Sequence, residues 1–173
     1  MKPPQTPPVE GLKNVFMEMR QYLTDSFLFN DYANKKMLEK IKQLPDPAEA
    51  VKYFSHLINS QNKWLKRIQV YPEDPKMDWW EPLYELGQLE EHWDKSLQAW
   101  IDFLNNKSEN ELQEEVKFVG YDGATWSCAL KDIALQFNYH SNHHRAQMQT
   151  IIRQQGLEPD FVYYIGTKYK RLG

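Results

Sequence analysis

The chain has 173 residues, of which 41% are hydrophobic and 14% aromatic, and its formal net charge at pH 7 is −3. This length and composition predict one folded domain with a hydrophobic core rather than a disordered segment. The basic residues are scattered along the sequence, which argues against a nucleic-acid-binding surface. With a single cysteine, Cys128, the chain cannot form an internal disulfide or a cysteine-based zinc site.

No stretch of the sequence approaches the length of a membrane span, so a membrane partner is not expected. Residues 1–8 are polar and proline-rich where a signal peptide would be apolar, which favours a soluble, cytoplasmic protein. We expect residues 1–9 to form a flexible N-terminal segment, residues 10–158 to form a helical domain, and residues 159–173 to form a C-terminal tail.

Apolar residues at intervals of three and four predict four long helices. The first is expected to end near Gln43. Residues 24–26 leave its continuity open, because Thr, Asp and Ser cap helices as readily as they interrupt them. The second is expected to begin after Asp46 and Pro47, which form a favourable cap and first-turn pair, and to run through Ile68.

The third helix is expected to open near Pro82 and to end at Asn105, and the fourth to run from about Ala124 to Gln155. Between them, residues 115–123 show a short apolar alternation and an Asp-Gly pair, which predict a small hairpin or an extended loop. The predicted fold is therefore all-α: an antiparallel four-helix bundle with this hairpin or loop before the fourth helix.

His140 and His144 are the most informative residues, because they fall within the apolar stripe of the fourth helix. Two imidazoles four positions apart project side by side, close enough to share one cation. The alternative is a pair of core histidines that find hydrogen-bond partners for all their ring nitrogens in apolar surroundings, which is costly. The spacing favours the metal site. The stripe consists of Leu130, Ile133, Ala134, Phe137, Met148, Ile151 and Ile152.

The stretch from Asn138 to Gln147 resembles the fourth-helix signature of the DinB/YfiT-like family, which is unrelated to the DinB DNA polymerase. The family's typical phrase has glycine where this chain has Ala146. Residues 31–38 and 56–65 are similar to the phrases of the family's first and second helices, and the resemblance spans residues 27–159.

This resemblance implies a four-helix bundle, commonly within a homodimer, that holds a divalent cation through His56, His140 and His144. The residues alone are less decisive for His56, because it lies away from the apolar stripe of the second helix and its spacing predicts a solvent-facing side chain. If the family pattern holds, the second helix is turned so that the side bearing Ser60 and Trp64 faces the bundle centre.

His143 is the alternative third ligand, whereas His92 is expected at the surface. Asn34 and Gln61 share faces with apolar residues, so their amides need partners in the core. Either amide would be satisfied by a hydrogen bond to a ligand histidine or by an ordinary network of core amides.

Four further expectations concern residues outside the histidine set. Cys128 is placed nearly opposite the His140/His144 face and is expected to be a packing residue rather than a nucleophile. Arg145 is expected in a surface or inter-subunit ion pair, with contact to an anionic substrate as the alternative. Three tryptophans are expected in the core, and two others, with residues 161–165, at a dimer interface or a pocket wall. The core set is Trp64, Trp93 and Trp100, and the other pair is Trp79 and Trp80.

Three neutral imidazoles suit a transition metal, most readily zinc or nickel, far better than magnesium or calcium. A three-histidine set leaves a coordination position for an exchangeable ligand, which is typical of catalytic sites. Because the ligands must be neutral, metal affinity is expected to fall as the pH drops through about 6.5.

The family resemblance implies a metal-dependent transferase that joins a low-molecular-weight thiol, such as bacillithiol, mycothiol or glutathione, to an electrophile, or a related hydrolase or isomerase. The alternative is a metal-binding bundle without chemistry, with a structural or interaction role. The sequence assigns no catalytic residue.

Overall fold

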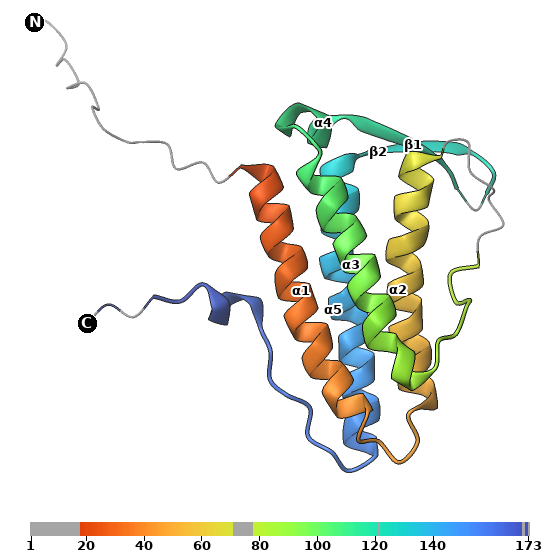
Figure 1. Cartoon of the computed structure of the whole chain (residues 1–173), viewed down its shortest axis with the longest axis vertical. Coiled ribbons are helices and arrows are strands. Elements are labelled where there is room, and N and C mark those ends of the chain that lie inside the picture. Colours follow the sequence, from red (N-terminus) through yellow and green to blue (C-terminus); the bar gives the residue numbers. More distant parts are fainter. Residues whose placement is uncertain (1–17, 71–77, 121, 171, 173) are drawn as a thin grey trace, which may run out of the picture.

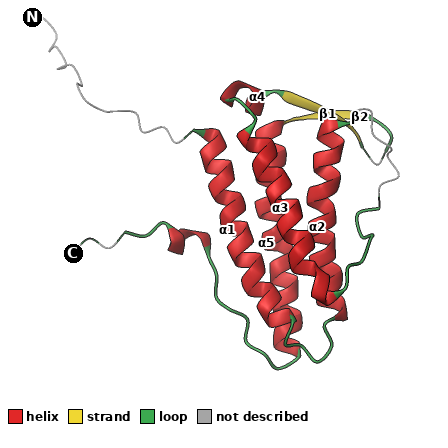
Figure 2. Cartoon of the chain, viewed as in Figure 1, coloured by secondary structure: helices red, strands yellow, loops and turns green. Residues whose placement is uncertain are grey.

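The computed structural model describes residues 18–70, 78–120, 122–170 and 172. Its four long helices are α1 (Met19–Ile41), α2 (Ala48–Gln69), α3 (Leu89–Asn105) and α5 (Leu130–Gln154), and they lie side by side in Figure 1. Most of the described residues are helical, as Figure 2 shows, so the prediction of a mainly helical chain is confirmed. The expected N-terminal segment, residues 1–9, lies outside the described residues.

One end of the long helices carries the short helix α4 (Glu109–Gln113) and an antiparallel hairpin of β1 (Glu115–Val119) and β2 (Thr125–Ala129) (Figure 1). Of the two alternatives for residues 115–123, the hairpin is the one that forms. The expectation that the fourth helix begins near Ala124 was wrong, because residues 125–129 pair with β1 and the helix begins at Leu130.

One further helix boundary differs from expectation, and the structure answers the question of whether the first helix is continuous, which the sequence left open. α1 continues without a break through residues 24–26, and within it the Ser26 hydroxyl donates to the Leu23 carbonyl oxygen (2.6 Å). α3 begins at Leu89 rather than near Pro82, after a 3₁₀ turn, η1 (Leu86–Gln88). Glu85 and Gln88 form a reciprocal capping box at that turn.

The core contains two clusters of buried apolar side chains, one toward each end of the helices. Trp93 and Trp100 are fully buried, as expected, whereas Trp64 is only half-buried. Each buried indole keeps a hydrogen bond: Trp93 Nε1 donates to the Asp31 carboxylate (2.8 Å) and Trp100 Nε1 to the Gln61 carbonyl oxygen (2.9 Å).

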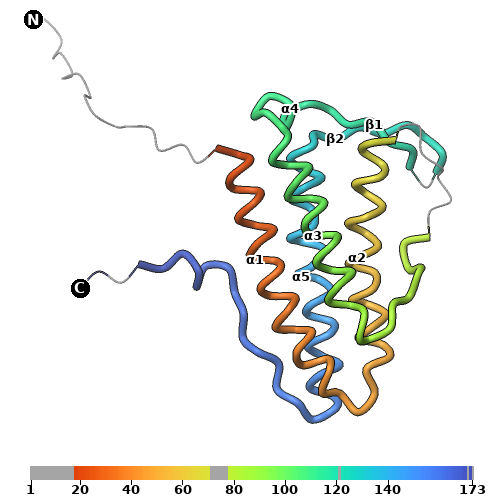
Figure 3. The backbone as a smooth tube through the Cα atoms, in the orientation of Figure 1, coloured from red at the N-terminus to blue at the C-terminus, as the bar shows by residue number. Residues whose placement is uncertain are grey.

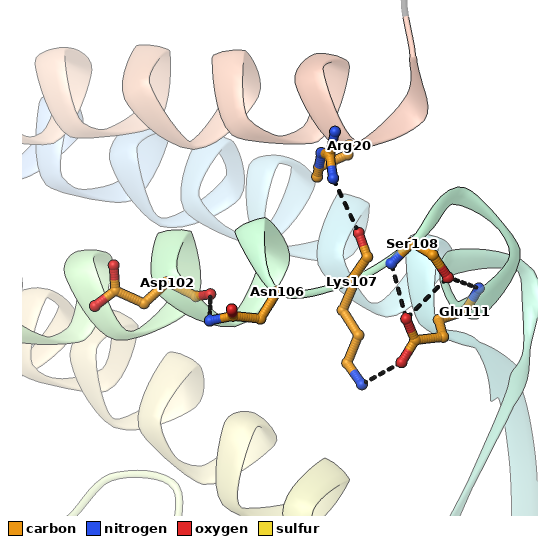
Figure 4. A network of polar contacts seen from close by, with 6 residues as sticks. All are labelled: Arg20, Asp102, Asn106, Lys107, Ser108 and Glu111. Atoms are coloured by element: carbon orange, nitrogen blue, oxygen red, sulfur yellow. Dashed lines mark hydrogen bonds and ion pairs between the residues drawn. The ribbon is translucent and has the colours of Figure 1, made fainter.

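The turn between α3 and α4 is fixed by a local polar network (Figure 4). Ser108 and Glu111 form a reciprocal capping box, and Lys107 pairs with the Glu111 carboxylate at 3.0 Å. Arg20 donates to the Lys107 carbonyl oxygen (3.4 Å), while the Glu109 carboxylate accepts from the first backbone N–H groups of α1. These contacts attach α4 to the start of α1.

The segment 78–84 runs along α2, and hydrogen bonds with Asn59 and Ser55 help to hold it there. The Asn59 amide donates to the Pro82 carbonyl oxygen (2.9 Å) and accepts from the Tyr84 hydroxyl (3.1 Å), while the Tyr84 backbone N–H donates to Ser55 Oγ (3.2 Å). This segment, with α3 and α5, covers α2 on several sides, so every residue from Phe54 to Gln61 is buried. Within the described residues, no helix is long and apolar enough to span a membrane.

Candidate metal site

Three histidine side chains from two helices converge at the middle of the molecule. His56 comes from α2, and His140 and His144 come from successive turns of α5. The Nε2 atom of His140 lies 3.1 Å from the Nε2 atom of His56 and 3.1 Å from that of His144. The structure thus brings together all three histidines that the sequence singled out, as a group that could hold a metal ion.

His56 is buried, with 7% of its surface exposed, so the solvent-facing position that its spacing favours was wrong. The spacing was misleading because it assumed one buried face. α2 buries both the Phe54–Ile58 stripe and the arc that carries His56 and Ser60. A helix enclosed on several sides does not show a single apolar stripe.

The outer ring nitrogens of two of the histidines are held by hydrogen bonds. His56 Nδ1 lies 2.8 Å from the Trp79 carbonyl oxygen, and His144 Nδ1 lies 2.6 Å from Gln147 Oε1. Both oxygens can only accept, so each Nδ1 carries a proton. In the neutral rings, the Nε2 atoms of His56 and His144 are therefore unprotonated, and their lone pairs face His140.

All three imidazoles are biased toward the neutral form. Burial lowers the pKa of His140 from 6.5 to about 3, with further lowering from His144 and His56. Burial also lowers the pKa of His144, to about 4, although its hydrogen bond to Gln147 acts in the opposite direction. The pKa of His56 is likewise lowered, mainly by burial. Neutral imidazole is the form that binds metal ions.

Aromatic rings enclose the histidines. The Trp80 ring lies flat on His56, with ring centroids 4.0 Å apart and an interplanar angle of 17°, and Tyr53 stacks on His144 at 5.5 Å. Beside them is a cleft of about 300 Å³ that reaches His56 and His140. Its remaining walls are Ser60, Trp64, Arg67, Trp79, Trp80, Gln136 and Phe137.

Arg67 places a buried positive charge in this cleft. Its side chain is 4% exposed, and its guanidinium lies over the rings of Trp64 (4.8 Å), Trp79 (4.9 Å) and Phe118 (5.4 Å). The two expectations for Trp79 and Trp80 were a dimer interface or a pocket wall, and both residues line this pocket.

Sequence reasoning missed the residues that orient the triad. Trp79 contacts His56 through its backbone carbonyl, a group that every residue has, so the residue type gives no signal for this contact. Trp80 reaches His56 only because the segment 78–84 folds back along α2. Gln147 carried a usable signal: it follows His144 by three positions, a spacing at which helix side chains meet.

The other described histidines are not part of the three-histidine group, although the His143 ring meets that of His144 edge to face at 4.9 Å. His143 is exposed on α5. His92 is half-buried rather than at the surface, because it stacks on Tyr84 with ring centroids 4.1 Å apart.

Cys128 belongs to β2 and not to the fourth helix, which corrects the helical position expected for it. Burial, followed by the charges of Asp132 and Glu115, raises the pKa of its thiol. A thiol with a raised pKa is a poor nucleophile, in agreement with a packing role.

The amides of Asn34 and Gln61 are buried, but their hydrogen bonds lead away from the triad. Asn34 Oδ1 accepts from Arg145 (3.0 Å), and Gln61 Oε1 accepts from Ser96 Oγ (3.1 Å). Arg145 itself is buried between α5 and α1, with 8% of its surface exposed, so its expected place in a surface ion pair was wrong.

The fold and the site together define a helical protein with three converging histidines beside an aromatic cleft. The chain belongs to the DinB family, whose model matches residues 19–171. No curated protein matches the chain with significant similarity.

Proposed function

We propose that His56, His140 and His144 bind one divalent transition metal ion and that the chain uses it to transfer a low-molecular-weight thiol to an electrophilic substrate. The observation that carries this proposal is the convergence of three histidine Nε2 atoms, in a group whose ligand atoms lie within 4.8 Å of one another. The outer ring nitrogens of His56 and His144 lie beside acceptor oxygens, which supports it. The family match supports it over most of the chain.

The donor set fits a metal better than it fits a hydrogen-bonded cluster. His140 Nε2 carries at most one proton, which can be directed at only one of its two neighbours, so at least one of the two 3.1 Å nitrogen–nitrogen contacts has no directed hydrogen bond and is repulsive. A cation between the rings removes this repulsion. Tetrahedral zinc with Zn–N bonds of about 2.05 Å spaces its nitrogen ligands by about 3.3 Å. His140 Nε2 lies 3.1 Å from each of its two neighbours, and all three ligand atoms lie within 4.8 Å of one another.

Zinc and nickel are the proposed metals, because imidazole nitrogen suits both and the described group contains neither thiolate nor carboxylate. When bound, such a metal lowers the pKa of an exchangeable water or thiol ligand and acts as a Lewis acid. The Trp79 carbonyl and Gln147 would keep the two outer histidines in the tautomer that binds it.

The cleft beside the triad supports a catalytic rather than a purely structural role. It reaches His56 and His140 and has the size of a small-molecule site. Its aromatic walls, including Trp64 and Trp80, would exclude water from an apolar electrophile, and the buried Arg67 would attract an anionic group of the thiol or of its partner.

Assembly and location belong to the same proposal. We propose a four-helix bundle over residues 10–158 that forms a homodimer, since apolar side chains are exposed on α1, α5 and the chain after residue 159. Examples are Tyr32, Tyr139 and Phe161. A cytoplasmic location fits a thiol substrate, which stays reduced there.

The test uses the untagged chain, purified without added metal and then loaded with cobalt. Glutathione or cysteine is titrated while the visible spectrum is recorded. A new thiolate-to-cobalt charge-transfer band, absent in His140→Ala and retained in His143→Ala, is the expected result. A cobalt spectrum that responds to no thiol or anion would contradict the transferase and leave the cation as a link between α2 and α5.

A further inference from the structure

A second cavity, of about 340 Å³, lies between α1, α5 and the C-terminal segment. This segment runs back along α1, as Figure 3 shows, with Asp160 next to Lys40 (3.7 Å) and Lys168 next to Asp25 (3.8 Å). The residues around the cavity are Tyr22, Ser26, Phe29, Leu135, Asn138, Tyr139, Asn142, Arg145, Val162, Tyr163 and Tyr164.

Among the described residues that line this cavity, Arg145 is the only basic one. It directly follows His144, and consecutive residues of a helix project about 100° apart. His144 therefore faces α2 and the metal site, whereas Arg145 faces α1, where its Nη1 atom donates to the side-chain oxygens of Asn30 and Asn34. The cavity is thus separate from the metal site.

Both partners of the Arg145 guanidinium are neutral amides, although the side chain is 92% buried. Within the described parts of the chain, no carboxylate forms an ion pair with it. The carboxylate of Asp160, which lines a neighbouring pocket with Arg145, pairs instead with Lys40. A buried positive charge without a counter-charge is costly, and a guanidinium has further N–H groups in its plane for a second acceptor.

The rest of the cavity fits a planar ring. Phe29 and Tyr164 meet edge to face at 5.3 Å on its wall, and Tyr139 and Tyr163 add two further aromatic side chains. Polar groups lie among them: Asn138 donates to Ser26 Oγ (2.8 Å) on the wall of the cavity. Aromatic walls around a few polar groups are typical of small-molecule sites.

We propose that this cavity binds a small aromatic or cyclic carboxylate, with its carboxylate on the guanidinium of Arg145 and its ring between the tyrosines. A carboxylate matches the planar fork of arginine in two parallel hydrogen bonds. It supplies the negative charge that the protein does not place beside this buried cation. This second site does not depend on the metal or on the proposed transferase reaction.

Isothermal titration of the full chain with benzoate tests the site, with benzamide as the neutral ligand of the same shape. Benzoate is expected to bind and benzamide to bind at least about tenfold more weakly, since one charged hydrogen-bonded pair is lost. Arg145→Gln should weaken benzoate binding by a similar factor. Arg153→Gln, an exposed arginine on the same helix, should leave it unchanged.

Two further variants keep the test decisive if Arg145→Gln does not fold. Tyr139 is 66% exposed and lines the cavity, so Tyr139→Ala should fold and weaken benzoate binding. His56→Ala removes a proposed metal ligand that does not line this cavity, and it should not alter benzoate binding. The proposal is overturned if wild type does not bind benzoate, if benzamide binds equally well, or if benzoate affinity falls in His56→Ala, which would place the ligand at the metal.

Discussion

Trp80 lies flat against His56, with ring centroids 4.0 Å apart. The Nδ1 atom of the same ring lies 2.8 Å from the Trp79 carbonyl oxygen. These two consecutive residues therefore fix both the plane and the tautomer of the His56 ring. Trp80→Ala should therefore weaken metal binding by about tenfold, the lower end of what a residue supporting a ligand contributes. Competition with a chromophoric chelator measures this affinity.

Two control variants distinguish the effect of losing the stacked ring at position 80 from the effect of losing any tryptophan. Trp80→Phe keeps an aromatic face for His56 and should stay within about threefold of wild type. Trp126→Ala removes a tryptophan that is 54% exposed on β2 and should have no effect. If Trp80→Phe binds as weakly as Trp80→Ala, the stacking argument is wrong.

Gln147 supports His144 in the same way from within α5, at 2.6 Å from its Nδ1 atom. Gln147→Leu keeps the size of the side chain but removes the acceptor, so the ring can rotate or change tautomer. We expect a loss of metal affinity of about 10- to 100-fold, with the fold intact by circular dichroism. Gln154→Leu, at an exposed position on the same helix, is the matched control.

Replacing a proposed ligand histidine should lower metal affinity more than replacing a residue that orients it. His144→Ala is expected to lower metal affinity by more than about 100-fold. His143→Ala removes the neighbouring, exposed imidazole and should leave the metal affinity unchanged. The metal content of both variants, purified in parallel and measured by plasma mass spectrometry, provides the comparison. Equal metal occupancy in the two variants would show that His144 is not a metal ligand.

The sequence was sufficient for the parts of this protein that depend on local periodicity. The regular apolar stripe of α5 located His140 and His144, and proline and glycine placed most helix ends within a few residues. It was insufficient where a contact depends on tertiary structure. His56 lies outside the apolar stripe of α2, and its burial results from contacts with the segment 78–84 and with α5.

The predictions for the start of α5 and for the position of Arg145 were wrong for related reasons. Residues 125–129 are compatible with a helix, but pairing with β1 satisfies their backbone groups in an extended conformation. Arg145 flanks the apolar stripe of α5, and its charge made a surface ion pair the expectation. It is buried because two asparagines one turn apart on α1, Asn30 and Asn34, accept its hydrogen bonds.

Burial also changes the pH at which protons compete with the metal. An ordinary imidazole would lose metal as the pH falls through about 6.5. In the folded chain the pKa of His140 is lowered to about 3 and that of His144 to about 4, both chiefly by burial. At His140 and His144, protons should therefore compete with the metal only near pH 4 and below, and the affinity of the folded protein for metal should not fall at pH 6.5 through these two residues.

The same pKa shifts predict how the stability of the metal-free chain depends on pH. In the unfolded chain, His140 and His144 bind protons at about pH 6.5, whereas in the folded chain they remain neutral down to about pH 4. Between these values the unfolded state binds more protons, so the free energy of unfolding falls as the pH falls. The slope is at most about 1.4 kcal/mol per pH unit for each histidine.

Urea unfolding in the presence of a chelator, at pH 7 and at pH 5, measures this dependence of the free energy of unfolding on pH. The double variant His140→Asn/His144→Asn should show a flatter dependence, while His143→Ala should keep the wild-type slope. If the double variant loses stability as steeply as wild type over this range, the acid sensitivity arises elsewhere in the chain.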